Sequence, residues 1–258
     1  MTRAIYAYIK TSYVVGIAFP GRLQIFWRKL STMATSRGAL IVFEGCDRSG
    51  KTTQCQKLLK RLQSEGIPSE LIKFPDRTTT IGQMINCYLG NKTELEDHAV
   101  HLLFSANRWE SVPKMKKILD SGTTLIVDRY AFSGVAFTAA KKGFTIDWCC
   151  QADIGLPRPD TVLYLTLSSE AASKRGDFGD ERYETVAFQK LVAQNFEKLS
   201  KMDDSWEVID ADRSVDEVHS QIYNITKRLI DKSKHRPLET LWEKKRKPLK
   251  SLCKGEIA

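Results

Sequence analysis

The chain has 258 residues, 42% of them hydrophobic and 28% charged, with a formal net charge of +9 at pH 7. These values allow one ordinary domain with a sizeable core, and no run approaches the ~18 apolar residues of a membrane-spanning helix. The charge lies at the ends: residues 1–43 hold six basic and no acidic residues, and residues 232–258 hold nine basic and three acidic. Because the middle has no basic excess, we expect no nucleic-acid partner, and because no run could span a membrane, we expect no membrane partner.

The first segment, residues 1–37, differs in composition from the rest. It contains Arg and Lys but no acidic residue, with scattered Ser, Thr and aromatic residues. Such N-termini, with amphipathic stretches like Arg22–Leu30, are typical of organelle import. We therefore predict a mitochondrial targeting segment, with an untranslated or disordered leader as the alternative. A chain starting at Met33 would lack it and would stay in the cytoplasm and nucleus.

The next feature is Gly45–Thr52 (GCDRSGKT), which matches the full phosphate-loop pattern G-x-x-x-x-G-K-[ST]. It stands between an apolar strand and a helical pattern, as the motif requires. Gly45 and Gly50 can take the backbone angles that turn successive N–H groups toward one point. Lys51 adds charge at the β- and γ-phosphates, and the Thr52 hydroxyl can bind Mg²⁺. The pattern predicts a nucleotide site.

Strands and helices alternate from about residue 38 to residue 232. Several strands are near-continuous Val, Ile and Leu runs, which suit strands buried on both faces of a parallel sheet. The alternation predicts an α/β fold: a five-stranded, doubly wound parallel sheet of the P-loop NTPase type, with its site at the carboxyl ends of the strands. We expect strands at Ala39–Glu44, Ser69–Phe74, Thr123–Asp128, Thr161–Thr166 and Glu207–Asp210, and helices at Thr52–Glu65, Leu95–Lys117 (bent near Pro113), Thr185–Met202 and Val215–Asp231.

Two charged turns follow predicted strands. Phe74–Arg77 (FPDR) places Arg77 in a Pro-fixed turn, where it can hold a phosphate with two hydrogen bonds. Asp128 and Arg129 end an apolar strand. A carboxylate there can reach Mg²⁺ directly or through water, and an Arg can neutralise charge on a transferred phosphoryl group. Both turns favour phosphoryl transfer over simple nucleotide binding.

A charged loop at residues 174–183 contains two glycines between helical segments. It suits a lid that closes over the site, excludes water and brings in Arg175 or Arg182, with an exposed turn as the alternative. Residues 233–258 form a basic C-terminal tail, of which Leu238–Trp242 could dock on the body. The six cysteines lack metal-ligand spacing and are interpreted as reduced thiols.

Together these stretches resemble the thymidylate kinases, which make dTDP from dTMP. The resemblance runs from Arg37 to about Trp242 and includes FPDR, EDHAVHLLFSANRWE, DRYAFSGVAF, GLPRPD and a lid ending in ERYE. It implies ATP as phosphoryl donor, dTMP as acceptor, Mg²⁺ as cofactor and a homodimer. Arg48 inside the phosphate loop is similar to the eukaryotic form of the family.

The resemblance also implies roles for individual residues. Phe104 would stack on thymine, Arg108 would bond the base edge, and Asp47 would accept from the 3′-hydroxyl. Thr52 and Asp128 would hold the metal, and Lys51, Arg48, Arg129 and Asp47 would form the catalytic set. ATP would contact Gly45, Arg48, Ser49, Gly50, Lys51, Thr52, Thr53, Arg129, Arg175 and Arg213. The dTMP pocket would consist of Asp47, Phe74, Arg77, Phe104, Arg108, Arg129, Ser133, Gly134, Phe137, Tyr183 and Gln189.

Three alternatives remain at this point. The first is a kinase for another nucleoside monophosphate, such as UMP or AMP. The second is a GTPase switch, because Asn91–Glu94 (NKTE) superficially resembles the guanine-reading N-K-x-D motif, although it ends in Glu and follows no apolar strand. The third is a non-catalytic phosphate-loop module, which the retained Lys51, Thr52, Asp128 and Arg129 disfavour.

Overall fold

The computed structural model describes residues 36–167 and 182–243. The chain divides at Ser36 and Arg37 into two units, and the fold given below is that of the second unit. Residues 1–35 of the predicted targeting segment, Arg175, most of the predicted lid and the end of the basic tail lie outside the described residues. No helix in the described part is long and apolar enough to cross a membrane.

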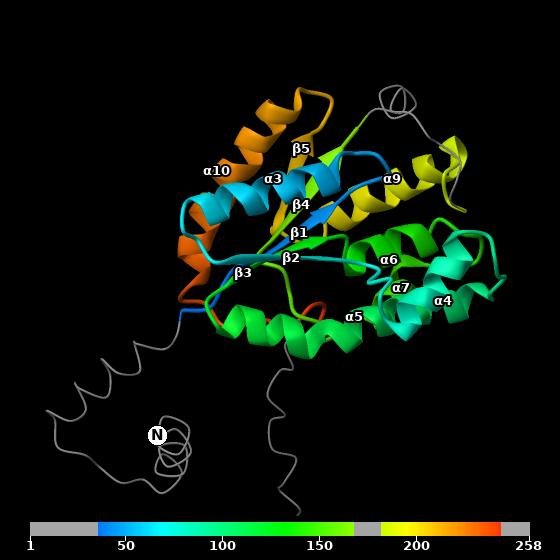
Figure 1. Ribbon diagram of the computed structural model, residues 1–258. Coiled ribbons are helices and arrows are strands. Elements are labelled where there is room, and N and C mark those ends of the chain that lie inside the picture. Colours follow the sequence, from blue (N-terminus) through cyan, green and yellow to red (C-terminus); the bar gives the residue numbers. More distant parts are fainter. Residues whose placement is uncertain (1–35, 168–181, 244–258) are drawn as a thin grey trace, which may run out of the picture. The chain divides into compact units, whose positions relative to one another are not determined.

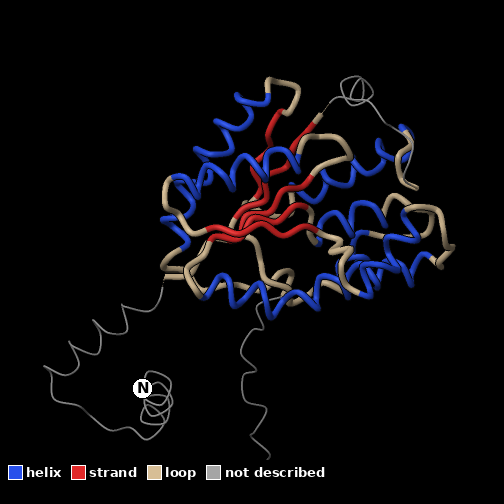
Figure 2. Tube along the Cα trace, viewed as in Figure 1, coloured by secondary structure: helices blue, strands red, loops and turns tan. Residues whose placement is uncertain are grey.

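A five-stranded sheet forms the centre of this unit (Figures 1 and 2). Its order is β2-β3-β1-β4-β5, and all four neighbouring pairs are parallel. The chain therefore starts in the middle of the sheet and winds outward to both edges, which confirms the predicted doubly wound fold. The strands are β1 (Leu40–Glu44), β2 (Ser69–Lys73), β3 (Thr124–Asp128), β4 (Thr161–Thr166) and β5 (Trp206–Asp210).

The four predicted helices are present, with ends that differ by a few residues. Pro113 lies inside a continuous α5. The sequence reasoning did not identify three shorter helices, α4, α6 and α7. The described helices are α3 (Lys51–Ser64), α4 (Thr80–Leu89), α5 (Asp97–Asp120), α6 (Ala131–Thr138), α7 (Ile146–Gln151), α9 (Val186–Ser200) and α10 (Val215–Ser233).

Helices cover both faces of the sheet (Figure 1). Alternate side chains of one strand point to opposite faces, so β1 contributes Leu40 and Val42 to one core and Ile41 and Phe43 to the other. The first core is completed by α5, α6 and α9, and the second by α3 and α10. Burial on both faces explains the unbroken apolar runs of the central strands.

After α10 the chain returns to the body through residues 238–242, which we call the C-terminal strap. Leu241 is buried in the first core, and Leu238 and Trp242 pack against it. The strap forms an antiparallel bridge between Thr240 and Pro157. The docking expected for this segment is therefore confirmed.

Candidate functional site

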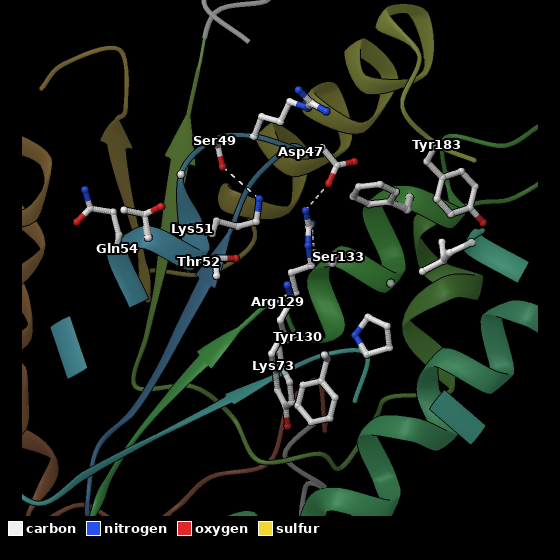
Figure 3. Close-up of a pocket in the computed structure, with 18 of the residues that line it drawn as sticks. Asp47, Ser49, Lys51, Thr52, Gln54, Lys73, Arg129, Tyr130, Ser133 and Tyr183 are labelled. Carbon is white, nitrogen blue, oxygen red and sulfur yellow. Dashed lines mark hydrogen bonds and ion pairs between the residues drawn. The ribbon is translucent and has the colours of Figure 1, made fainter. Parts of the chain in front are cut away.

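A cavity of about 850 Å³ opens at the carboxyl ends of the strands (Figure 3). It runs from the phosphate loop to an aromatic pocket formed by α5, α6 and the segment before α9. Seventeen predicted site residues line it: Asp47, Arg48, Ser49, Gly50, Lys51, Thr52, Thr53, Phe74, Arg77, Phe104, Arg108, Arg129, Ser133, Gly134, Phe137, Tyr183 and Arg213. Gly45, Asp128 and Gln189 do not line the cavity but are hydrogen-bonded to residues that do, namely Arg129, Thr52 and Asp47. Arg175 lies outside the described residues.

The phosphate loop has the backbone that its sequence predicts. Gly50, with φ 90°, precedes the first residue of α3, and Gly45 has φ 147°. A Cβ on Gly45 would lie 2.5 Å from the Leu165 carbonyl oxygen, so only glycine fits. The first turn of α3 has no acidic residue, which leaves its N–H groups and dipole available to an anion.

Lys51 lies at the centre of this loop and is 4% exposed. Its Nζ donates to the Cys46 carbonyl oxygen at 2.6 Å and to Ser49 Oγ at 3.2 Å. Burial, and then the nearby positive charge of Arg129, lower the pKa of Lys51 to about 8. A bound phosphate would remove this penalty by supplying the missing negative charge.

Arg129, whose φ is 68°, brings the phosphate loop and α6 together. Its Nη2 pairs with Asp47 Oδ1 at 2.5 Å (Figure 3). Its Nη1 donates to the Gly45 carbonyl and to Ser133 Oγ, both at 3.3 Å. Gln189 donates to the other Asp47 oxygen at 2.7 Å. The family resemblance assigns Asp47 to the sugar hydroxyl. In this structure Asp47 instead pairs with Arg129, one of the predicted catalytic residues.

Thr52 and Asp128, the predicted magnesium ligands, lie within hydrogen-bond distance of each other. Thr52 Oγ1 donates to Asp128 Oδ2 at 2.6 Å, while Asp128 Oδ1 is buried and has no hydrogen-bond partner. A buried carboxylate oxygen without a partner next to a hydroxyl suits a hard cation. Within the described ranges no cluster of three His, Cys, Asp or Glu side chains could hold a metal. Mg²⁺ needs none, since it commonly takes one or two protein ligands plus phosphates and water.

The aromatic end of the cavity is built from three segments. Phe74 follows β2, the half-buried Phe104 comes from α5, and Phe137 from α6. Tyr183 stacks on Phe188 with ring centroids 5.1 Å apart and meets Phe137 edge-on at 5.7 Å. This flat, apolar space suits a planar base.

Arginines lie around this aromatic end. Arg77 Nη1 donates to Asn86 Oδ1 at 2.8 Å, which holds it beside the turn. Arg108 is almost fully buried and forms a double hydrogen bond with Asp153. The sequence reasoning thus found the arginines of the pocket but not their anchors.

Glu44 is a further site residue that the sequence reasoning missed. It is fully buried at the end of β1 and accepts from the Tyr130 N–H, the Ser133 N–H and Ser133 Oγ at 2.9, 3.0 and 2.5 Å. Burial raises its pKa. Glu44 therefore fixes the turn that carries Arg129. A carboxylate at the end of a wholly apolar strand, directly before a phosphate loop, was the available signal.

Asn107 was missed as well. It is completely buried in α5 and clasps the FPDR turn, accepting from the Asp76 N–H at 2.7 Å and donating to the Asp76 carbonyl at 3.2 Å. It also donates to Thr79 Oγ1 at 3.0 Å. The turn that presents Arg77 is thus held by a side chain about thirty residues further along the chain.

Arg182, one of the two arginines considered for the lid, makes other contacts. Its guanidinium binds both carboxylate oxygens of Glu94 at 2.6 and 2.9 Å, and Nε donates to the Tyr88 carbonyl. Glu94 belongs to the NKTE stretch that resembles a guanine-reading motif. That stretch lies against the base of the lid and does not line the cavity.

The cysteines behave as passive side chains. The five in the described ranges are free thiols, and Cys149 and Cys55 are buried. Burial raises the pKa of the Cys46 thiol to about 11, despite the nearby Lys51. A thiolate in the phosphate loop is therefore disfavoured at neutral pH.

Comparison with known proteins identifies the family. The family model "Thymidylate kinase" matches residues 43–222. The chain is 55% identical to the thymidylate kinase of Danio rerio over 213 residues and 51% identical to that of Homo sapiens over 212 residues. These alignments cover 81% and 82% of this chain and all of each relative.

A solved structure agrees with the sequence comparison. The thymidylate kinase of Candida albicans superposes with a TM-score of 0.73 at 40% identity, over 80% of this chain and 98% of that one. The family match extends from the end of β1 to α10, and thus contains the phosphate loop, the aromatic pocket and the arginines that line the cavity. This chain belongs to the thymidylate kinase family.

Proposed function

We propose that the chain transfers the γ-phosphoryl group of ATP to dTMP, giving dTDP and ADP, within the single cavity described above. The observation that carries this proposal is the continuity of that cavity. It joins a phosphate loop for the donor to an aromatic pocket ringed by arginines for the acceptor. Two bound nucleotides would therefore meet with their phosphates between Lys51 and Arg129.

The reaction needs no general base from the protein. The attacking group is a phosphate oxygen, and the second pKa of a monophosphate is about 6, so the nucleophile is mostly dianionic at neutral pH. The enzyme has to bring two anions together in line and neutralise their repulsion. Lys51, Arg48 and Arg129 are cations that line the space between the two sites.

Each part of the chain has a definite task in this proposal. The phosphate loop and α3 would orient the donor phosphates, with Arg213 at the adenine end. Arg77 and Arg129 would hold the acceptor phosphate, and Phe104 and Arg108 would hold the base. Thr52 and Asp128 would hold Mg²⁺, which when bound neutralises charge on the β- and γ-phosphates.

Substrate preference tests the proposal. ADP release is measured with ATP, Mg²⁺ and each of dTMP, UMP, AMP and dCMP. We expect dTMP to be used far better than AMP and dCMP, because Arg108 offers only donors and so suits the carbonyl oxygens of thymine. Uracil has the same carbonyl oxygens, so discrimination against UMP would come from the thymine methyl group in the aromatic pocket and from the sugar. The Candida albicans relative is described as having broad substrate specificity. The panel therefore includes UMP, AMP and dCMP as possible substrates. A clear preference for another monophosphate would refute the assignment.

We also propose a homodimer. Leu102 and Trp109 lie seven residues apart on α5 with exposed fractions of 52% and 38%. Trp148 and Ile154, from α7 and the loop after it, are similarly exposed. Trp148 contacts His101 of α5, and Trp109 lies beside Gly155, so these four side chains extend one apolar surface. Such a patch supports a protein–protein contact.

Finally, we propose that residues 1–37 direct the full-length chain to mitochondria and that a chain starting at Met33 remains in the cytoplasm and nucleus. The support is the acid-poor, Arg-containing composition of this segment. Imaging of fluorescent fusions with each start site would test the proposal. Identical distributions of the two forms would contradict it.

A further inference from the structure

Arg108, the proposed base-reading residue, does not stand alone. It is 2% exposed, and its Nε and Nη2 donate to the two carboxylate oxygens of Asp153 at 3.1 and 2.6 Å. The Asp153 side chain is fully buried. The pair comes from α5 and from the loop after α7, forty-five positions apart in sequence.

The geometry leaves one edge of the guanidinium for a ligand. In the described part of the chain, Nη1 of Arg108 donates no hydrogen bond to protein, and Arg108 lines the cavity. Gly134 of α6 lies against the same group: a Cβ there would be 2.8 Å from Nη2 and 3.1 Å from Nη1. The guanidinium is thus held between Asp153 and α6, and Nη1 is the donor that remains for a ligand in the cavity.

Hydrogen bonds from α5 and from the C-terminal strap hold Asp153 and its loop in position. Ser105 Oγ donates to Asp153 Oδ1 at 2.7 Å and to the Ala152 carbonyl at 3.0 Å. On the other side, the C-terminal strap pairs with the same loop: the Gly155 N–H donates to the Leu241 carbonyl at 2.9 Å, and the Leu241 N–H to the Leu156 carbonyl at 2.7 Å. The loop that carries Asp153 is therefore held by α5 and by the strap.

We propose that Asp153 is a positioning residue for base selectivity: it fixes the Arg108 guanidinium so that only a carbonyl oxygen is accepted at the edge of the base. This inference rests on the proposed dTMP kinase activity. Asp153 also balances the charge of Arg108, so the floor of the pocket carries a donor without net charge and does not compete with Arg77 for phosphate. A cytosine amino group would meet a fixed donor and find no acceptor.

The test is Asp153→Asn, assayed with dTMP and dCMP in the full-length enzyme. The amide would turn an N–H₂ group toward Arg108, so one hydrogen bond is lost and the guanidinium can rotate. We expect KM for dTMP to rise roughly tenfold to a hundredfold, as for loss of a hydrogen bond to a charged group, with little change in kcat or in KM for ATP. The ratio of kcat/KM for dTMP to that for dCMP should fall by a similar factor.

A matched control is available in the same fold. Arg37 and Asp160 form another double hydrogen bond between largely buried side chains, at 2.7 and 2.6 Å, away from the cavity lining. Asp160→Asn should lower the melting temperature and leave the base selectivity unchanged. If Asp153→Asn does not fold, Ser105→Ala removes one partner of Asp153 and should raise KM for dTMP severalfold.

These measurements distinguish a failure of the role proposed for Asp153 from a failure of the proposed kinase activity. A folded Asp153→Asn or Ser105→Ala enzyme with the KM and the selectivity of the unmodified enzyme would overturn the role of Asp153 while leaving the kinase assignment intact. An equal loss of selectivity in Asp160→Asn would also overturn it. If the unmodified enzyme does not prefer dTMP, the proposed function itself fails.

Discussion

At the scale of single residues, the cavity depends on a few buried charges whose partners are fixed. Lys51 is 4% exposed and is directed by two hydrogen bonds toward the phosphate loop. Asp47 and Arg129 face each other across the junction of the donor and acceptor sites. Because these groups are held before substrate arrives, little reorganisation is needed at the moment of reaction.

We expect Lys51→Ala to lower kcat by at least about a hundredfold, since a preorganised donor at the transferred phosphoryl group is lost. The fold should survive, because the substitution removes a buried cation that burial already disfavours. Lys57→Ala, in the same helix but paired with the exposed Asp216, is the matched control and should keep full activity. Near-normal phosphoryl transfer by Lys51→Ala would show that this loop is not the donor site.

The pKa of Lys51 leads to a pH prediction. Burial lowers it to about 8 in the free protein, so the amine is charged below that pH and increasingly neutral above it. Phosphate binds the charged form, and binding above pH 8 therefore requires proton uptake. We expect kcat/KM for ATP to fall as pH rises through about 8, and Lys51→Arg to lack this fall because its charge persists. A flat profile for the unmodified enzyme would contradict the account.

At the scale of elements, the strap shows how a chain end supports the site from a distance. Leu241 is 1% exposed and lies in the same core cluster as α5 and α6. We expect Leu241→Ala to reduce the free energy of unfolding by about 2–5 kcal/mol, through lost burial and a residual cavity. Urea denaturation monitored by fluorescence would measure this. A loss below that of an exposed position such as Leu191→Ala would mean that the strap does not pack as described.

The elements also show what sequence alone can predict. The central strands are recognisable because burial on both faces demands unbroken apolar runs, and α3, α5, α9 and α10 are long enough to show a helical pattern. Two of the missed helices give weak signals. α7 has only six residues, too few to establish a helical period, and α6 is apolar on nearly all sides because it lies within the core, so it shows no polar face.

The residues of the site also differ in how well the sequence predicts them. Lys51 and Arg129 could be named from the sequence, because each belongs to a short contiguous motif, whereas Asp47 was named only through the family resemblance. Glu44, Asn107 and Asp153 could not, since their partners lie about thirty to ninety positions away and meet them only after folding. The chain shows which groups do chemistry, and the fold shows which groups hold them in place.

At the scale of the whole molecule, the proposed homodimer depends on one exposed apolar surface. The apolar surface of Leu102, Trp109, Trp148 and Ile154 is the proposed contact. We expect Leu102→Glu to convert a dimer into a monomer in light scattering coupled to gel filtration, because a charge would be buried at the interface. Val208→Glu, at a similarly exposed site on β5, should leave the dimer intact. A monomeric unmodified protein would contradict the proposal.

We propose above that one cavity joins an ATP site at the phosphate loop to a dTMP site at the aromatic pocket. The most direct measurement is the steady-state rate of ADP release with ATP and Mg²⁺ across a panel of nucleoside monophosphates. We expect the highest kcat/KM for dTMP, with UMP, AMP and dCMP far below it. A higher kcat/KM for any of these, or failure to discriminate dTMP from UMP, would contradict the account.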